Sequence, residues 1–323
     1  MSARLEIARI LITMSWTRAV AITARRPGFT DRRAQGTLSG NTRLIEQFIG
    51  LSKDSINLAD IGAAFLGEPA PYQPLLDNGL AKVFAFEPDE REIETLRKHL
   101  GERGQVIPYA VGDGRPHLFH ICPKKSGMSS LLEPDNRTLA FFNLFPEFGK
   151  VISTAVVSTR RLDDIEELPN LDFCKMDCQG SELMILANGR KKLSECVVIQ
   201  TEISFITLYK KQPTFADIDQ ELRYQGFIPH CFTHLKRWSI SPVVRNNNPR
   251  QPFNQLLEAD IVYIRNVIQS DTVNDLQLKK LAAIAHIVYK SPDLATRCIL
   301  EMEKRRICDA GTARRFCALS SGN

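Results

Sequence analysis

Short apolar segments alternate with amphipathic ones from residue 41 to residue 265, and this pattern predicts strands that alternate with helices. A buried strand forms a short continuous apolar run, whereas a helix has apolar residues three and four positions apart. The alternation is typical of a mostly parallel sheet with helices on both faces. The predicted strands are 57–63, 82–87, 106–111 with a short extension at 118–122, 151–158, 171–177, 197–203, 228–240 and 259–265, and the predicted helices are 41–51, 89–100, 181–193, 215–224, 276–289 and 294–306.

The first two predicted strands each end at a residue that suits a nucleoside site. The first ends at Gly62 and the second at Glu87. A glycine lets the backbone approach a ligand closely, and a carboxylate at the end of the second strand can accept both hydroxyls of a ribose. The pair indicates a cofactor of the adenosine type.

The segment between these strands favours a cofactor without phosphates. A dinucleotide fold needs G-x-G-x-x-G at the start of a helix, and here only Gly62 and Gly67 are present. Three prolines follow within residues 69–74, so any helix that begins there is short. S-adenosylmethionine fits this pattern better than a nicotinamide dinucleotide.

A second cluster of polar residues follows the strand 171–177. Lys175 and Asp177 lie at its end, Glu182 lies at the start of the next helix, and the strand 197–203 brings Glu202 to the same edge. Ligands of open α/β sheets bind outside the carboxyl ends of the strands. We therefore expect these side chains to converge with Gly62 and Glu87.

The length of 323 residues predicts one α/β domain with extensions at both ends. The expected division is a basic tail over 1–40, a catalytic domain over 41–267 and a helical extension over 268–323. The helices 276–289 and 294–306 form an apparent hairpin that is interpreted as a cap or a dimerisation element. A homodimer through these helices is one expectation.

The net charge of the chain is concentrated near its start. Residues 1–50 contain eight Arg, no Lys and three acidic residues, which gives +5, the net charge of the whole chain. The neutral remainder argues against a nucleic-acid enzyme with a broad basic face. The basic start is read as a targeting peptide, a flexible tail or the product of an early start codon, with Met14 as the next methionine.

The cysteines and the apolar runs narrow the class of protein further. The eight Cys form no C-x-x-C pair and no spacing with His that suits zinc, so we expect reduced thiols, a cytoplasmic protein and no metal. No apolar run approaches the roughly 18 residues that span a bilayer. His117 and His120 are left open as residues of a half-exposed strand face or as a general base, and His230 and His234 as residues of a strand-like segment or of an acceptor pocket.

Six motifs in order resemble those of the FkbM family of S-adenosylmethionine-dependent methyltransferases. They are Asp60-x-Gly62, Phe86-Glu87-Pro88, Ala110-Val111-Gly112, Gly127-Met128-Ser129-Ser130-Leu131, Arg161-Leu162-Asp163 and Lys175-x-Asp177-x-Gln179-Gly180-x-Glu182. The resemblance covers about residues 41–265. It implies a Rossmann-like class I methyltransferase fold, with a seven-stranded, mostly parallel sheet.

The resemblance also implies roles for individual residues. Asp60 and Gly62 would line the methionine end of the cofactor, Glu87 would bind the ribose, Asp113 would lie near the adenine and Asp177 would lie where cofactor and acceptor meet. Pro88 and Val111 lie within these motifs, Ala63 follows the first of them, and the three complete the expected cofactor contacts. Two residues differ in type from the family pattern: Ala64 stands where asparagine is usual, and Gln179 where an acid is usual. In addition, the glycine after the first strand falls one residue late, at Gly67.

The expected chemistry is O-methylation of a small-molecule or glycan acceptor. Asp177 would position the acceptor hydroxyl or take its proton, and Lys175 and Glu202 would support the site. Family members methylate hydroxyls on sugars, polyketides and other metabolites, and the sequence does not choose among these. Two alternatives stay open: a relative that binds the cofactor without catalysis, and a dinucleotide-dependent oxidoreductase.

Overall fold

A computed structural model describes residues 47–63, 69–88, 90–123 and 126–320 of the chain. The basic segment 1–40, most of the predicted helix 41–51, Ala64 and Gly67 lie outside these residues.

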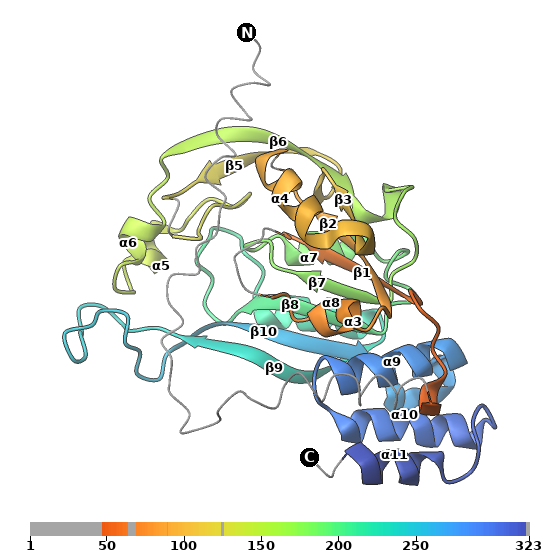
Figure 1. The fold of residues 1–323 in the computed structure, drawn as a ribbon. Coiled ribbons are helices and arrows are strands. Elements are labelled where there is room, and N and C mark those ends of the chain that lie inside the picture. The colour runs from red at the N-terminus through yellow and green to blue at the C-terminus, as the bar shows by residue number, and fades with distance from the viewer. Residues whose placement is uncertain (1–46, 64–68, 89, 124–125, 321–323) are drawn as a thin grey trace.

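A seven-stranded sheet forms the centre of the molecule (Figure 1). Its order is β3-β2-β1-β7-β8-β10-β9, and β10 runs antiparallel to both of its neighbours while the other pairs are parallel. The strands are β1 (Ile56–Ile61), β2 (Ala81–Phe86), β3 (Gly104–Ile107), β7 (Phe173–Met176), β8 (Val198–Ser204), β9 (Phe227–Arg237) and β10 (Leu256–Arg265). The predicted fold class is confirmed.

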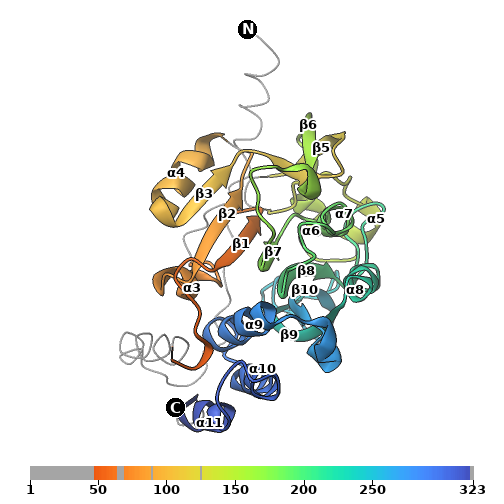
Figure 2. The same cartoon turned by 90° about the vertical axis from the view of Figure 1, so that its right-hand side faces the viewer.

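Helices cover both faces of this sheet, as Figure 2 shows from the side. On one face, α3 (Gln73–Asp77), α4 (Glu90–Leu100) and the C-terminal helices share one apolar core with the strands. On the other face, α7 (Glu182–Ala187) and α8 (Phe215–Tyr224) enclose a second core. The strand order reverses between β1 and β7, and the crevice at such a reversal is where open α/β sheets bind ligands.

A second, three-stranded sheet was not predicted as a unit. It has the order β4-β6-β5 and consists of β4 (Ala110–Gly112), β5 (Pro116–Ile121) and β6 (Ser153–Arg161). The prediction of one strand over 106–111 is wrong, because Pro108 and Tyr109 interrupt it and the two parts join different sheets. The segment 118–122 does not extend that strand either, because β5 pairs antiparallel with β6. The short helices α5 (Asn136–Leu139) and α6 (Phe145–Phe148) lie between β5 and β6 in the sequence.

The C-terminal helices are integrated into the core of the molecule. They are α9 (Asp275–Ile287), α10 (Pro292–Lys304) and α11 (Thr312–Ser320), of which α11 was not predicted. Apolar side chains of all three belong to the same core as those of β1, β2 and β8. The apolar face of α9 is thus used within the chain, and a homodimer through these helices stays a prediction.

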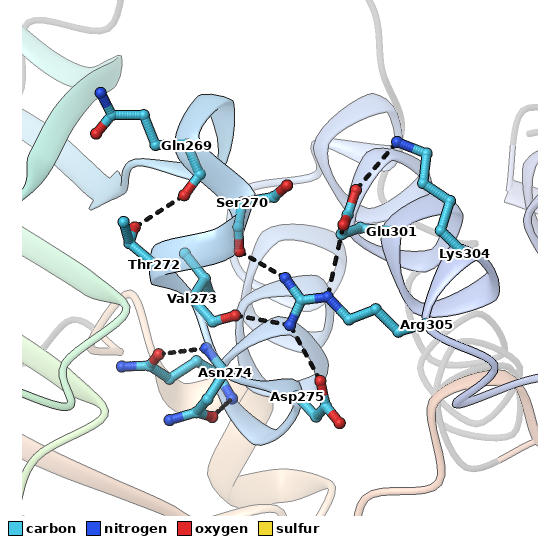
Figure 3. Close-up of polar contacts among 10 residues, drawn as sticks. Gln269, Ser270, Thr272, Val273, Asn274, Asp275, Glu301, Lys304 and Arg305 are labelled. Atoms are coloured by element: carbon cyan, nitrogen blue, oxygen red, sulfur yellow. Dashed lines mark hydrogen bonds and ion pairs between the residues drawn. The ribbon is translucent and has the colours of Figure 1, made fainter.

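Arg305 at the end of α10 joins these helices to the preceding segment η4 (Val267–Thr272) (Figure 3). Its guanidinium donates to the carbonyls of Ser270 and Val273 at 2.5 and 2.8 Å and pairs with Asp275 at 3.0 Å. It also pairs with Glu301 at 3.5 Å. One side chain therefore satisfies groups from three consecutive elements.

The remaining differences from the predicted elements are in length. The predicted helix 181–193 ends early, because α7 stops at Ala187 and turns follow. Among the described residues, no helix has both the length and the apolar character needed to cross a membrane.

Candidate active site

A pocket lies at the carboxyl ends of β1, β2 and β7, next to the point where the strand order reverses. Gly62, Glu87, Pro88, Val111 and Asp177, five of the predicted site residues, line it. Much of the remaining lining is apolar, from Ile61, Phe86, Phe119, Leu131 and Val157. Among the described residues, no Lys or Arg lines this pocket. It therefore suits a ligand with an apolar ring system and no phosphate.

Glu87 follows β2 directly and is almost completely buried, with 4% of its surface exposed. Its backbone N–H donates to the carbonyl of Ile107 on β3 at 3.2 Å, which fixes the start of the loop. Tyr109 and Val111 line the same pocket from the next segment of the chain. The carboxylate thus lies beside a surface suited to an aromatic base.

Gly62 lets the ends of β1 and β7 approach each other closely. Its φ is +81°, and a Cβ at this position would lie 2.3 Å from the carbonyl oxygen of Asp177. The Asp177 N–H donates to the carbonyl of Ile61 at 3.1 Å. The glycine is therefore required by the backbone of the neighbouring strand, in addition to any ligand.

Asp60 and Lys175 do not line the pocket and form a buried pair instead. They are register partners on β1 and β7, and Lys175 Nζ lies 3.0 Å from Asp60 Oδ1. The Tyr72 hydroxyl donates to Asp60 Oδ2 at 2.6 Å. Burial opposes the charge on Lys175, but the carboxylates of Asp60 and Asp177 outweigh it and raise the pKa of Lys175. Burial and Asp60 together raise the pKa of Tyr72.

Gln179 connects two of the predicted carboxylates. Its side-chain amide donates to Asp177 Oδ1 at 3.2 Å and to Glu202 Oε2 at 3.1 Å. Its amide oxygen accepts from the Tyr209 hydroxyl at 3.3 Å, and its backbone carbonyl accepts from Ser130 Oγ at 2.7 Å. With a φ of +52°, Gln179 has a left-handed backbone that directs the side chain toward the two acids.

Four carboxyl groups interact with one another at this site: Asp177, which lines the pocket, and Glu182, Glu202 and Glu258, which do not. Burial, followed by the charges of Glu258, Asp177 and Glu182, raises the pKa of Glu202 well above its ordinary value. Lys236 pairs with Glu258 and offsets part of this negative charge. Glu202 therefore tends to hold a proton, which reduces the repulsion within the cluster.

Glu182 begins α7 and bonds to the loop that carries Asp177. Its carboxylate accepts from the Cys178 N–H at 2.7 Å, and only 3% of the residue is exposed. Burial raises the pKa of Glu182 to about 7. Glu182 therefore acts as a local cap of the loop 177–181.

The other predicted residues lie apart from the pocket lining. Ala63 packs in the core of the opposite face, and its N–H donates to the Phe86 carbonyl at 3.2 Å. Asp113 pairs with His117 at 2.7 Å and accepts from the Arg115 N–H. His230 bonds to Ser291 on the loop before α10. Asp113 near the adenine remains a prediction without support from this lining.

Comparison with known proteins gives the family of the chain. A family model described as the methyltransferase FkbM domain matches residues 60–229, which is more than half of the 323 residues. The chain belongs to the FkbM methyltransferase family. The match begins at Asp60 and includes the ends of β1, β2 and β7. The pocket described above therefore lies within the family's domain.

One curated relative carries a more specific name. The 2-O-methyltransferase NoeI of Sinorhizobium fredii is 32% identical over 144 residues, which cover 41% of this chain and 57% of that protein. The chain thus spans a little over half the length of this relative.

Solved structures give more distant matches. The precorrin-6y C5,15-methyltransferase of Geobacter metallireducens is 11% identical, with a TM-score of 0.33 over 74% of this chain and 93% of that one. The magnesium protoporphyrin IX methyltransferase of Synechocystis is 10% identical, with a TM-score of 0.34 over 75% and 87%.

Sequence reasoning missed Tyr72 and Tyr209. Tyr72 lies in the proline-rich segment that was read only as a poor helix start, and it contacts Asp60 across 12 residues. Tyr209 lies in a loop after β8 with no motif around it. Gln179 was noticed as a departure from the family pattern, but its hydrogen bonds to two acids depend on a backbone conformation that the sequence does not reveal.

Proposed function

We propose that the protein transfers a methyl group from S-adenosylmethionine to a hydroxyl of its acceptor. The observation that carries this proposal is the pocket at the reversal of strand order, with Glu87 on one side and Asp177 on the other. Membership of the FkbM methyltransferase family supports the reaction class, and the name of the relative NoeI supports a hydroxyl as the acceptor group.

The residues present fit S-adenosylmethionine better than a dinucleotide. The pocket combines acidic groups with an apolar lining and has no Lys or Arg among its described residues, so it matches a cation without phosphates. Glu87 would accept hydrogen bonds from the ribose hydroxyls, and Tyr109 and Val111 would contact the base. Gly62 and Asp177 would lie toward the methionine end.

The protein's own contribution to the reaction would be modest and local. When bound, the cofactor supplies a methyl group that is already a strong electrophile, so the protein needs to align the acceptor and remove a proton. Asp177 would accept the hydrogen bond of the acceptor hydroxyl and receive its proton. Gln179 would hold Asp177 in place, and the raised pKa of Glu202 would limit the negative charge that develops beside Asp177.

The cofactor proposal is tested by calorimetric titration with S-adenosylhomocysteine. We expect a micromolar affinity, roughly −8 kcal/mol, and a weakening of about 10- to 100-fold in Glu87→Ala, because a hydrogen bond to a charged group contributes about 1.5–3 kcal/mol. The exposed Glu102→Ala serves as control.

The ribose role of Glu87 has a sharper readout. Wild-type protein should bind adenosine more tightly than 2′,3′-dideoxyadenosine, and Glu87→Ala should bind the two alike. An equal preference in both proteins would remove Glu87 from the ribose site.

The catalytic proposal is tested with a labelled methyl donor and a panel of free sugars and their octyl glycosides. Product label that survives mild base indicates a methyl ether, whereas a methyl ester releases methanol. We expect Asp177→Asn to lower turnover 100-fold or more with the affinity for S-adenosylhomocysteine unchanged, while the exposed Asp271→Asn keeps its activity. Cofactor binding without transfer to any acceptor would favour the non-catalytic alternative.

A further inference from the structure

An apolar groove lies beside the candidate active site, on the connection between β9 and β10. It has a volume of about 760 Å³. Figure 1 shows this connection projecting from the ends of β9 and β10, on the side of α5 and α6. The apolar side chains that form the groove include Phe205, Trp238, Ile240, Val243, Phe253 and Leu256.

The lining of this groove is uncharged. Its polar members among the described residues are Asn254 and Gln255, and none is acidic or basic. Val243 and Phe253 are 53% and 49% exposed, although the Arg245 guanidinium lies over the Phe253 ring at 5.3 Å. Water-exposed apolar side chains gathered around a hollow favour the binding of an apolar group.

Hydrogen bonds hold the walls of the groove in place. The Trp238 indole N–H donates to the Asn143 carbonyl at 2.8 Å, and its ring packs edge-on against Phe145. The Asn143 side chain donates to the Val243 carbonyl at 2.7 Å. The groove is therefore built by contacts with the α5–α6 region, and its shape exists before any ligand arrives.

The groove lies near the candidate active site, since Gln179 of the pocket donates to Glu202 on β8. Glu202 lies on β8 and Phe205 follows three residues later, which is about 10 Å along an extended chain. Tyr209 bonds to Gln179 at the site and shares a small core with Ile206 and Trp238. A molecule that reaches from Asp177 into the groove would therefore need to be longer than one sugar ring.

We propose that this groove binds the apolar portion of the methyl acceptor. The acceptor is then a neutral, amphipathic molecule that carries its reacting hydroxyl about 10 Å from an extended apolar part. This inference rests on the proposed function, and it selects among the acceptors of that function: a free, fully polar sugar would leave the groove empty.

Trp238 reports directly on the groove. The chain has two Trp, at positions 16 and 238, so Trp16→Phe leaves Trp238 as the only one. In this background, Trp fluorescence is followed during titration with methyl, hexyl and octyl β-D-glucoside below their micelle concentrations. We expect the affinity to rise with chain length, by up to about fourfold per methylene buried.

Matched variants locate this binding. Val243→Ser combined with Phe253→Ser should weaken octyl glucoside binding at least tenfold. Ile268→Ser combined with Leu276→Ser removes two apolar side chains of equal or greater exposure on η4 and α9, and it should leave binding unchanged. The affinity for S-adenosylhomocysteine should be the same in all these proteins.

Three outcomes would overturn the assignment. They are an affinity that does not depend on chain length, an equal loss in both double variants, and a concentration-dependent dimer in sedimentation that only Val243→Ser/Phe253→Ser abolishes. The last would assign the groove to a second copy of the chain. If octyl glucoside binds in the groove but S-adenosylhomocysteine does not bind at all, the groove would still be an apolar binding site. The proposed methyl transfer would then be wrong.

Discussion

Gly62 shows how one residue can link two strands at the site. A side chain at this position would meet two obstacles: the positive φ and the carbonyl oxygen of Asp177 2.3 Å from the Cβ. The first costs roughly 1–2 kcal/mol for a residue with a Cβ, and the second forces the ends of β1 and β7 apart. Because Asp177 would move, both stability and the site would be affected.

We therefore expect Gly62→Ala to lower the free energy of unfolding by more than about 2 kcal/mol and to weaken binding of S-adenosylhomocysteine. Urea denaturation and calorimetry measure the two effects. Gly101→Ala is the matched control, since Gly101 also has a positive φ, of +56°, but has no atom within 4 Å of a built Cβ. Equal losses in the two variants would show that the contact with Asp177 has no energetic weight.

The role of Gln179 depends on the two acidic residues that its side chain contacts. The amide group donates to both Asp177 and Glu202, and a carboxylate there would instead add a further negative charge between them. The departure from the family pattern thus lowers the charge of the cluster while it keeps the two acids in place. An acidic residue needs a proton or a cation to do the same.

At the scale of the element, α7 depends on the acid at its first position. Glu182 is buried, and its pKa is raised to about 7 from an ordinary value of 4.5. The folded protein then binds a proton more tightly than the unfolded chain does. This contribution to stability is fully present below about pH 4.5 and declines as the pH rises through about 7.

Glu182→Gln keeps an oxygen that accepts from the Cys178 N–H and removes the titration. We expect the stability of the wild-type protein, relative to this variant, to fall by about 3 kcal/mol between pH 4.5 and pH 7. Urea denaturation across this range provides the measurement, and the exposed Glu102→Gln should follow the wild-type protein. A difference between Glu182→Gln and wild type that is constant with pH would contradict the raised pKa.

The elements that the sequence predicted well are those of the main sheet. Strands β1, β2, β7 and β8 are mostly buried, and each is a short segment rich in apolar residues that is followed by a polar residue or glycine at or near its end. The strand β6 was predicted over 151–158, but the small sheet was missed because the apolar pattern does not tell which strands pair, and the partners β4 and β5 lie far earlier in the sequence. Helices of four residues such as α5 and α6 are too short for a period of 3.6 to appear.

The apolar pattern also indicates which residues lie at the ends of parallel strands, and this accounts for part of the pocket lining. Residues that end predicted strands, such as Gly62, Glu87 and Asp177, line one pocket because parallel strands bring their ends together. Lys175 lies on β7, whose end reaches the pocket, yet its side chain pairs with Asp60 and does not line the pocket. The direction of a side chain near a strand end depends on register, which the apolar pattern alone does not give.

At the scale of the whole molecule, a buried ion pair adds to the apolar core that joins the C-terminal helices to the sheet. Lys280 on α9 lies 2.7 Å from Asp172 Oδ1, and the other oxygen of Asp172 accepts from the Asn57 N–H at 2.8 Å. Both side chains are at least 90% buried. Asp172 precedes β7 and Asn57 is the second residue of β1, so the pair lies at the edge of the sheet opposite the candidate active site.

Removal of one partner would leave the other charge buried without compensation. We expect Lys280→Met to lower the free energy of unfolding by about 3–5 kcal/mol, and addition of Asp172→Asn to restore most of it, because asparagine still accepts from the Asn57 N–H. Urea denaturation of the single and double variants measures this coupling. Since the pair is remote from Glu87 and Asp177, the affinity for S-adenosylhomocysteine should be unchanged in whatever protein remains folded. A loss below 1 kcal/mol in Lys280→Met would mean that α9 is held by its apolar contacts alone.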